Sequence, residues 1–246
     1  MRRLEPEEAL ALWDGFPVDR QPRPIVLMGS SIGPGGGPMV DDKIAVLRNA
    51  PVVSDVELPP GVLEALQPAY PAQQQADPVR VRSVRRVYPE FRTDRGHRPL
   101  AAYRIEFEGT RFKPGHAPNP KSEGAGFPAI HALDPGVEAA TWWPAGLDTS
   151  YRGGLRHLPP AVLVDGGRTV RVTVNGSPAA YTDVKVAAVL ESRTAALLVI
   201  QTTPRPGVEV IPAVAVGRLV IARLSTPLGA RVLLQRDGIP IEVLPG

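Results

Sequence analysis

A serine between two glycines is the segment whose residue types come closest to a catalytic motif. Residues Gly29–Gly33 fit the pattern G-x-S-x-G and follow the apolar run Ile25–Met28. In hydrolases with this pattern the serine lies on a tight turn between a strand and a helix, next to backbone amides that stabilise the oxyanion. The prolines and glycines that follow immediately disfavour a helix, so a simple turn is the expected structure. Catalysis by Ser31 is the alternative. Its partners would be the base His157 and an acidic residue that precedes this histidine in the chain, either Asp134 or Asp148.

The motifs for phosphate, metal and cofactor binding are absent or incomplete. A Walker loop needs a lysine directly after its last glycine, whereas the nearest lysine, Lys43, follows two aspartates. The chain contains no cysteine, which excludes thiol catalysis, cysteine-ligated zinc and iron–sulfur clusters from it. Its four histidines are never two or four residues apart, the spacings at which one strand or helix presents two ligands. The sequence therefore predicts neither a metal site nor a cofactor.

Basic residues are concentrated in the middle of the chain. Residues 1–77 contain 6 basic and 11 acidic residues, residues 78–157 contain 13 and 8, and residues 158–246 contain 9 and 6. Seven arginines fall between residues 80 and 98, where Val79, Val81 and Val87 could face a core. The arginines would then form a stripe on the other face of the strand. The residues expected to bind a partner through this stripe are Arg80, Arg82, Arg85 and Arg86.

Three interpretations of this stripe stay open. It binds an acidic protein or the acidic N-terminal segment, it binds the phosphates of a nucleic acid, or it is a solvated sheet face whose arginines also protect an edge strand. Nucleic acid is the less favoured partner, because only Tyr88 and Phe91 lie near enough in sequence to stack on bases. Arginine also accounts for 24 of the 28 basic residues, a bias that codon composition produces without any function.

Two further segments are candidates for partner binding. In an extended chain neighbouring side chains point to opposite faces, so Trp142 and Trp143 could not both enter one core in that conformation. One indole would then be exposed, unless both are buried between the two halves of the chain. The 19 residues Gly109–Phe127 have no periodicity, and loops longer than about 12–15 residues are usually functional or disordered. Within them, Lys113 and His116 are the candidate binding residues.

The first third of the chain predicts short mixed α and β elements. A helix is expected over Pro6–Trp13, where Glu7 and Glu8 complement the helix dipole. Strands are expected at Ile25–Met28 and Val52–Leu58, and helical turns after Asp41 or Asp42 and after Pro60. Residues 67–78 contain three prolines and four glutamines, which predicts a connector and a first part spanning residues 1–77.

The rest of the chain predicts strands. The valine spacing slips between Val81 and Val84, which indicates a β-bulge or a change of exposed face. Further strands are expected at Tyr103–Phe107 and Pro128–Leu133. From residue 158 onward we expect an antiparallel β domain, preceded by a β-rich middle segment over residues 78–157. Its strands are expected at Ala161–Val164, Thr169–Val174, Tyr181–Leu190, Ala195–Gln201, Val208–Ile211, Arg218–Leu224, Arg231–Leu234 and Ile239–Leu244. Turns are expected at Asp165-Gly166, Asn175-Gly176, Pro206-Gly207, Leu228-Gly229 and Asp237-Gly238.

The sequence thus predicts a mainly β protein, with a C-terminal antiparallel sandwich or open barrel and a small mixed α/β N-terminal part. The N-terminus lacks the apolar core of a signal peptide and no apolar run is long enough to span a membrane, so a cytoplasmic protein is expected. The leading hypothesis is a non-catalytic binding or structural protein whose partner is another protein. The alternatives are a serine hydrolase with its site near Gly29–Gly33, and nucleic-acid binding through Arg80–Arg98. No oligomeric state is predicted.

Overall fold

The computed structural model describes residues 4–34, 50–66, 78–108, 129–147, 158–208, 210 and 214–245. Within them the protein is mainly β with a small helical part, as the sequence predicts. The helices are α1 (Pro6–Ala11), α3 (Val62–Leu66) and α4 (Pro135–Ala139), with a 3-10 turn at Asp165–Gly167. The strands are β1 (Ile32–Pro34), β2 (Val52–Ser54), β3 (Val79–Val87), β4 (Glu90–Thr93), β5 (Gly96–Pro99), β6 (Ala102–Phe107), β7 (Ala129–Leu133), β8 (Ala161–Val164), β9 (Thr169–Gly176), β10 (Thr182–Glu191), β11 (Ala195–Pro204), β12 (Val216–Arg223), β13 (Val232–Gln235) and β14 (Val243–Pro245).

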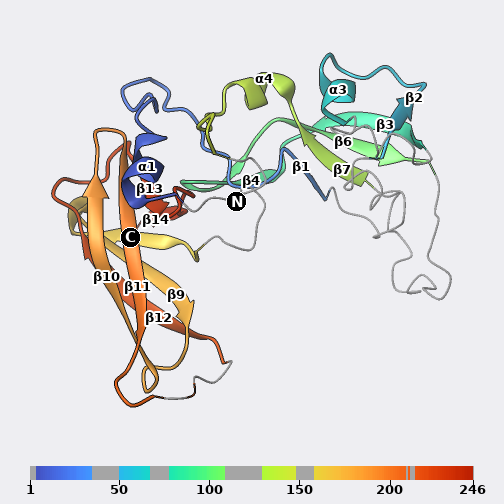
Figure 1. The fold of residues 1–246 in the computed structure, drawn as a ribbon. Coiled ribbons are helices and arrows are strands. Elements are labelled where there is room, and N and C mark those ends of the chain that lie inside the picture. Colours follow the sequence, from blue (N-terminus) through green and yellow to red (C-terminus); the bar gives the residue numbers. More distant parts are fainter. Residues whose placement is uncertain are drawn as a thin grey trace. The chain divides into compact units, whose positions relative to one another are not determined.

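The chain divides into two compact units, each built from several segments (Figure 1). Unit 1 comprises residues 1–29, 92–97 and 141–246, and unit 2 comprises residues 30–91 and 98–140. The composition changes near residues 77 and 157 do not coincide with these boundaries. The reason is that segments far apart in sequence pack together, above all the N-terminal residues with the C-terminal strands.

Unit 1 contains two unclosed sheets and a helical layer. One sheet has the strand order β12-β9-β8-β14 and the other has the order β10-β11-β13. A first core, which includes Val172, Leu198 and Leu233, lies between these two sheets. A second core, which includes Trp13 and Leu197, joins α1 and the residues after it to the other face of β11 and β13. Alternate residues of β11 therefore enter different cores, which explains why its first four residues are all buried.

The pairing in unit 1 is antiparallel between the hairpin strands but includes two parallel pairs. Strand β11 pairs with β13 in parallel, and β8 pairs with β14 in parallel. The sequence did not predict these pairs, because hairpin turns leave a signal in the sequence and pairing between distant strands does not. Both sheets are open, which agrees with the predicted sandwich or open barrel.

Most of the predicted turns are present, and one is misplaced. Glycines with positive φ stand at residues 166, 207, 229 and 238, as the turn dipeptides predicted. The prediction for Asn175-Gly176 is wrong, because both residues still pair with β12 and the turn follows them. Ile239–Leu244 was predicted as one strand, but only β14 at its end forms, since Pro240 makes a single isolated bridge to Leu234.

The N-terminal elements are shorter than the sequence predicted. Ile25–Met28 forms only isolated bridges, to Thr141 and Thr93, and Val52–Leu58 is reduced to β2. Val208 and Val210 lie in no strand. The helical turn expected after Asp41 or Asp42, the connector at residues 67–77 and the 109–127 segment lie outside the described residues. No helix in the described part of the chain is long and apolar enough to cross a membrane.

Unit 2 is a five-stranded sheet of order β1-β7-β6-β3-β2. Helix α3 contributes Val62 and Leu66 to the core of this unit, where they pack with Val81, Ile105 and Ile130 from the sheet. The alternate residues of the same strands form a second face of the sheet, which is only partly exposed, because Ala102, Ala129 and Leu133 on it are buried.

A buried ion pair closes the turn between β12 and β13 in unit 1. Arg231 donates to a carboxylate oxygen of Glu191 at 2.7 Å and to the carbonyl oxygens of Thr226 and Pro227. The other oxygen of Glu191 accepts from the amide of Ser225 at 2.6 Å. Burial alone would raise the pKa of Glu191, but these hydrogen bonds outweigh it, so the pKa lies below the ordinary value of 4.5.

This lowered pKa predicts an acid-dependent loss of stability. A carboxylate with a lowered folded-state pKa stabilises the fold above its unfolded pKa, and that stabilisation is lost as the pH falls through the folded pKa. We expect the free energy of unfolding to decrease below about pH 4.5, and Glu191→Gln to lack this component. Urea unfolding of both proteins across acid pH measures it, and parallel pH profiles would contradict the assignment.

Candidate binding surface

Strand β3 presents its arginines on more than one face, because a bulge interrupts it. The register of β3 with β6 shifts between Val81 and Ser83, which leaves Arg82 as the extra residue. The bulge predicted from the valine spacing is therefore confirmed. After it, Val84 packs against the unit 2 core. By alternation Arg85 and the half-buried Val87 lie on the second face of the sheet, so Val87 does not share a face with Val79 and Val81.

The register across unit 2 places two arginines and a histidine in one line on this second face. Arg85 on β3 pairs with Arg104 on β6, and Arg104 pairs with His131 on β7. Residues directly opposite each other in antiparallel strands project to the same face. We call Arg85, Arg104 and His131 the basic row. Arg85 and Arg104 are like charges in directly opposed positions, an arrangement that destabilises a sheet.

One carboxylate partly neutralises the basic row. Arg104 lies 3.4 Å from an oxygen of Glu106, and both side chains are largely buried. The other oxygen of Glu106 accepts from the Ser83 hydroxyl at 2.9 Å, so Glu106 is already shared. The Nε of Arg104 is buried and has no hydrogen-bond partner among the described residues. Arg85 is exposed, and no ion pair joins it to any acidic side chain of the described residues.

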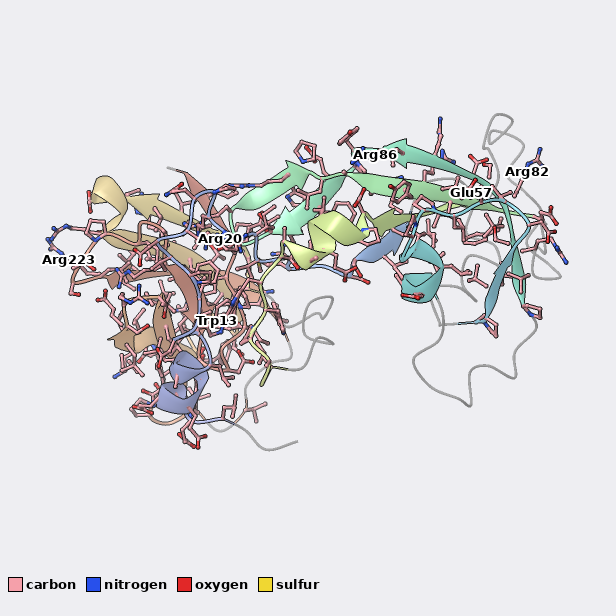
Figure 2. The ribbon with its side chains drawn as sticks, turned by 90° about the horizontal axis from the view of Figure 1, so that it is seen from above. Trp13, Arg20, Glu57, Arg82, Arg86 and Arg223 are labelled. Carbon is pink, nitrogen blue, oxygen red and sulfur yellow. The ribbon has the colours of Figure 1, made fainter. Side chains whose placement is uncertain are left out.

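The other arginines predicted to bind are placed differently. Arg80 pairs with Asp55 and, at 3.7 Å, with Glu108. Arg86 points to the face opposite Arg85 and lies 3.4 Å from Asp134. Arg82 and Arg86 both project outward from the sheet (Figure 2). Asp55, which pairs with Arg80, comes from the acidic N-terminal segment of the chain.

Two arginines of the same basic segment belong to the interior of unit 1. Arg92 donates to Glu242 at 2.6 Å, and Arg95 donates to the carbonyl oxygens of Gly229 and Arg231. These guanidiniums hold the segment 92–97 in place, so their role in the described structure is stabilisation. The seven arginines of the sequence pattern therefore do not form one surface.

The surroundings of Ser31 give no support to the hydrolase alternative. The residues after it form strand β1, not the helix that a nucleophile elbow needs. The backbone oxygen of Ser31 accepts from Leu133, and no hydrogen bond joins its hydroxyl to a described residue. Asp148 and His157, its proposed partners, lie outside the described residues, as do Lys113 and His116. Among the described residues no three histidine or acidic side chains gather closely enough to hold a metal ion.

The two adjacent tryptophans belong to an aromatic cluster in unit 1. Residues 142 and 143 lie in no strand, so strict alternation does not apply to them. Both rings contact Trp13, with centroids 5.1 Å away for Trp142 and 6.0 Å away for Trp143. Phe16 completes the cluster (Figure 2 shows Trp13 next to α1). The condition for opposite faces, an extended strand, is therefore not met, and both indoles are partly buried against the second core.

Sequence reasoning missed Arg104 and His131 as neighbours of Arg85. Arg104 was recognisable as the polar position between Tyr103 and Ile105, but only the strand register places it opposite Arg85. Comparisons with known proteins add nothing to this geometry: no family model, no curated protein and no solved structure matches the chain.

Proposed function

We propose that the protein is a non-catalytic binding protein, and that the basic row of unit 2 binds an acidic segment of another protein. The observation that carries this proposal is the pairing of Arg85 with Arg104 across β3 and β6. Two like charges at directly opposed positions cost free energy in the unbound protein. An acidic partner would convert that cost into two favourable contacts.

The chemistry of guanidinium favours a carboxylate partner at this row. Arginine presents several donors in a fixed plane, which suits bidentate contact with carboxylates. Nucleic-acid modules stack single-stranded bases on exposed aromatic side chains, and the basic row itself contains no aromatic residue. Phe91 is buried, and Tyr88 lies near the side chain of Arg86. The row therefore offers charge without a stacking platform, which is the pattern expected for an acidic protein segment.

The test is a titration with a synthetic glutamate-rich peptide at about 150 mM salt. We expect Arg85→Ala to weaken binding about tenfold, the loss of one charge-assisted contact. Arg86→Ala is the matched control, because Arg86 is adjacent and exposed but lies on the other face and is already paired. Arg20→Ala, an exposed arginine of unit 1, is the second control. An equal effect of all three substitutions, or no effect of Arg85→Ala, would contradict the proposal.

A further inference from the structure

Two exposed aliphatic side chains lie on the outer face of β12, the edge strand of the β12-β9-β8-β14 sheet in unit 1. Leu219 and Ile221 on β12 are 62% and 56% exposed, which is unusual for large aliphatic side chains in mid-strand. Across from them on β9, Ile221 pairs with Arg171 and Leu219 pairs with Thr173. We call Leu219, Ile221, Arg171 and Arg223 the β12 patch.

The β12 patch is positively charged. Arg171 and Arg223 are exposed and no ion pair joins either of them to a described acidic side chain. Strands β8, β9, β12 and β14 contain no acidic residue. Asp165 at the β8–β9 turn is occupied by a hydrogen bond from the Thr169 hydroxyl. Figure 2 shows Arg223 projecting outward, away from Trp13 and α1. The patch is thus an apolar centre flanked by two guanidiniums.

A second surface of unit 1 has the opposite charge. A depression of about 400 Å³ lies between α1 and the end of β10. Its apolar floor includes Leu10, Val189 and Leu190, and its carboxylates are Glu7, Asp14 and Glu191, with no basic residue in the lining. Glu191 is committed to Arg231, whereas Glu7 and Asp14 are exposed and make no ion pair with a described residue.

We infer that a second copy of this chain places its β12 patch in this depression. Each surface combines an apolar centre with flanking charges, and the charges have opposite sign. A contact between the β12 patches of two copies would be less favourable. It would bring together Arg171 and Arg223 of both copies without a carboxylate between them. The contact is therefore heterologous, joining different surfaces of the two copies, and it generates either a ring or an open filament. This inference does not depend on the proposed function of unit 2.

Two double variants test whether the β12 patch of one copy binds the depression of another. Leu219→Ser with Ile221→Ser removes the apolar centre of the patch, and Glu7→Lys with Asp14→Lys reverses the charge of the depression. All four side chains are at the surface, so both variants are expected to fold, and circular dichroism is the check of their folding. Val53→Ser with Val56→Ser, which alters exposed valines of unit 2, is the matched control.

Sedimentation velocity measures the outcome. We expect the wild-type chain and the valine control to associate with rising concentration, and less so at high salt because the charges are then screened. Each double variant alone should be monomeric. An equimolar mixture of the two should form a two-chain species and nothing larger, because only one intact patch and one intact depression remain per pair. A monomeric wild type, self-association of either variant, or a mixture that stays monomeric would overturn the inference.

Discussion

Replacing Asp94 by alanine is expected to lower the free energy of unfolding of unit 1 by about 3–5 kcal/mol, the usual cost of breaking a buried ion pair. The Asp94 side chain is only 2% exposed, and both of its oxygens accept from Arg23, at 2.5 and 3.2 Å. Arg95 lies 3.7 Å from the same carboxylate. Without Asp94, two guanidiniums remain together in a largely buried site. The aspartate was not predictable as a structural residue, because Arg23 lies 71 positions away in sequence.

The three tryptophans make this experiment specific to unit 1. Trp13, Trp142 and Trp143 all belong to that unit, so the fluorescence of the intact chain reports its unfolding in urea. Asp19→Ala is the control within unit 1, since the Asp19 side chain is 88% exposed and its pair with Arg193 is solvent-screened. We expect this control to change stability by at most about 1 kcal/mol. Equal losses of unfolding free energy in the two variants would contradict the conclusion that the buried Arg23–Asp94 ion pair stabilises unit 1.

Trp13→Ala is expected to destabilise unit 1 by about 3–5 kcal/mol. Trp13 is fully buried, lies at the centre of the aromatic cluster, and donates from its indole nitrogen to the Gly238 carbonyl at 2.9 Å. Truncation removes the ring contacts and leaves that carbonyl without this donor. Trp13→Phe keeps an aromatic ring and loses mainly the hydrogen bond, so a smaller loss of about 1–3 kcal/mol is expected.

Circular dichroism is the appropriate measurement for these two variants, because the substitution itself changes the fluorescence. We expect stability to decrease in the order wild type, Trp13→Phe, Trp13→Ala. A Trp13→Ala protein within about 1 kcal/mol of wild type would mean that the second core does not depend on the aromatic cluster.

Local features of this fold were predictable from the sequence, and pairing between distant segments was not. The bulge at Arg82 follows from a slip of one residue in the valine spacing, and turn dipeptides such as Asp237-Gly238 encode their own backbone geometry. The parallel pair of β11 and β13 leaves no such mark. Likewise, the long apolar run of β11 indicates burial on both faces only when α1 is known to cover one of them.

The same distinction applies to the binding surface. The composition identifies a basic segment, but it does not say which arginine lies on which face of the sheet, because a bulge interrupts the alternation of β3. The sequence does not distinguish Arg92 and Arg95 from Arg85. In unit 1, however, Arg92 donates a hydrogen bond to Glu242 and Arg95 donates to backbone carbonyl oxygens. Arg104 and His131 enter the surface through strand register, which residue types alone do not specify.

The most direct test of the proposed function is a backbone-amide NMR titration of the intact chain with the glutamate-rich peptide at about 150 mM salt. We expect the chemical-shift changes to concentrate at residues 83–85, 104–106 and 131. These changes should be lost in Arg85→Ala. A parallel titration with duplex DNA should show no binding at the same salt concentration, since a few phosphate contacts are strongly weakened there. Peptide-induced shifts confined to unit 1, or DNA binding that survives this salt and moves the same amides, would contradict the proposal.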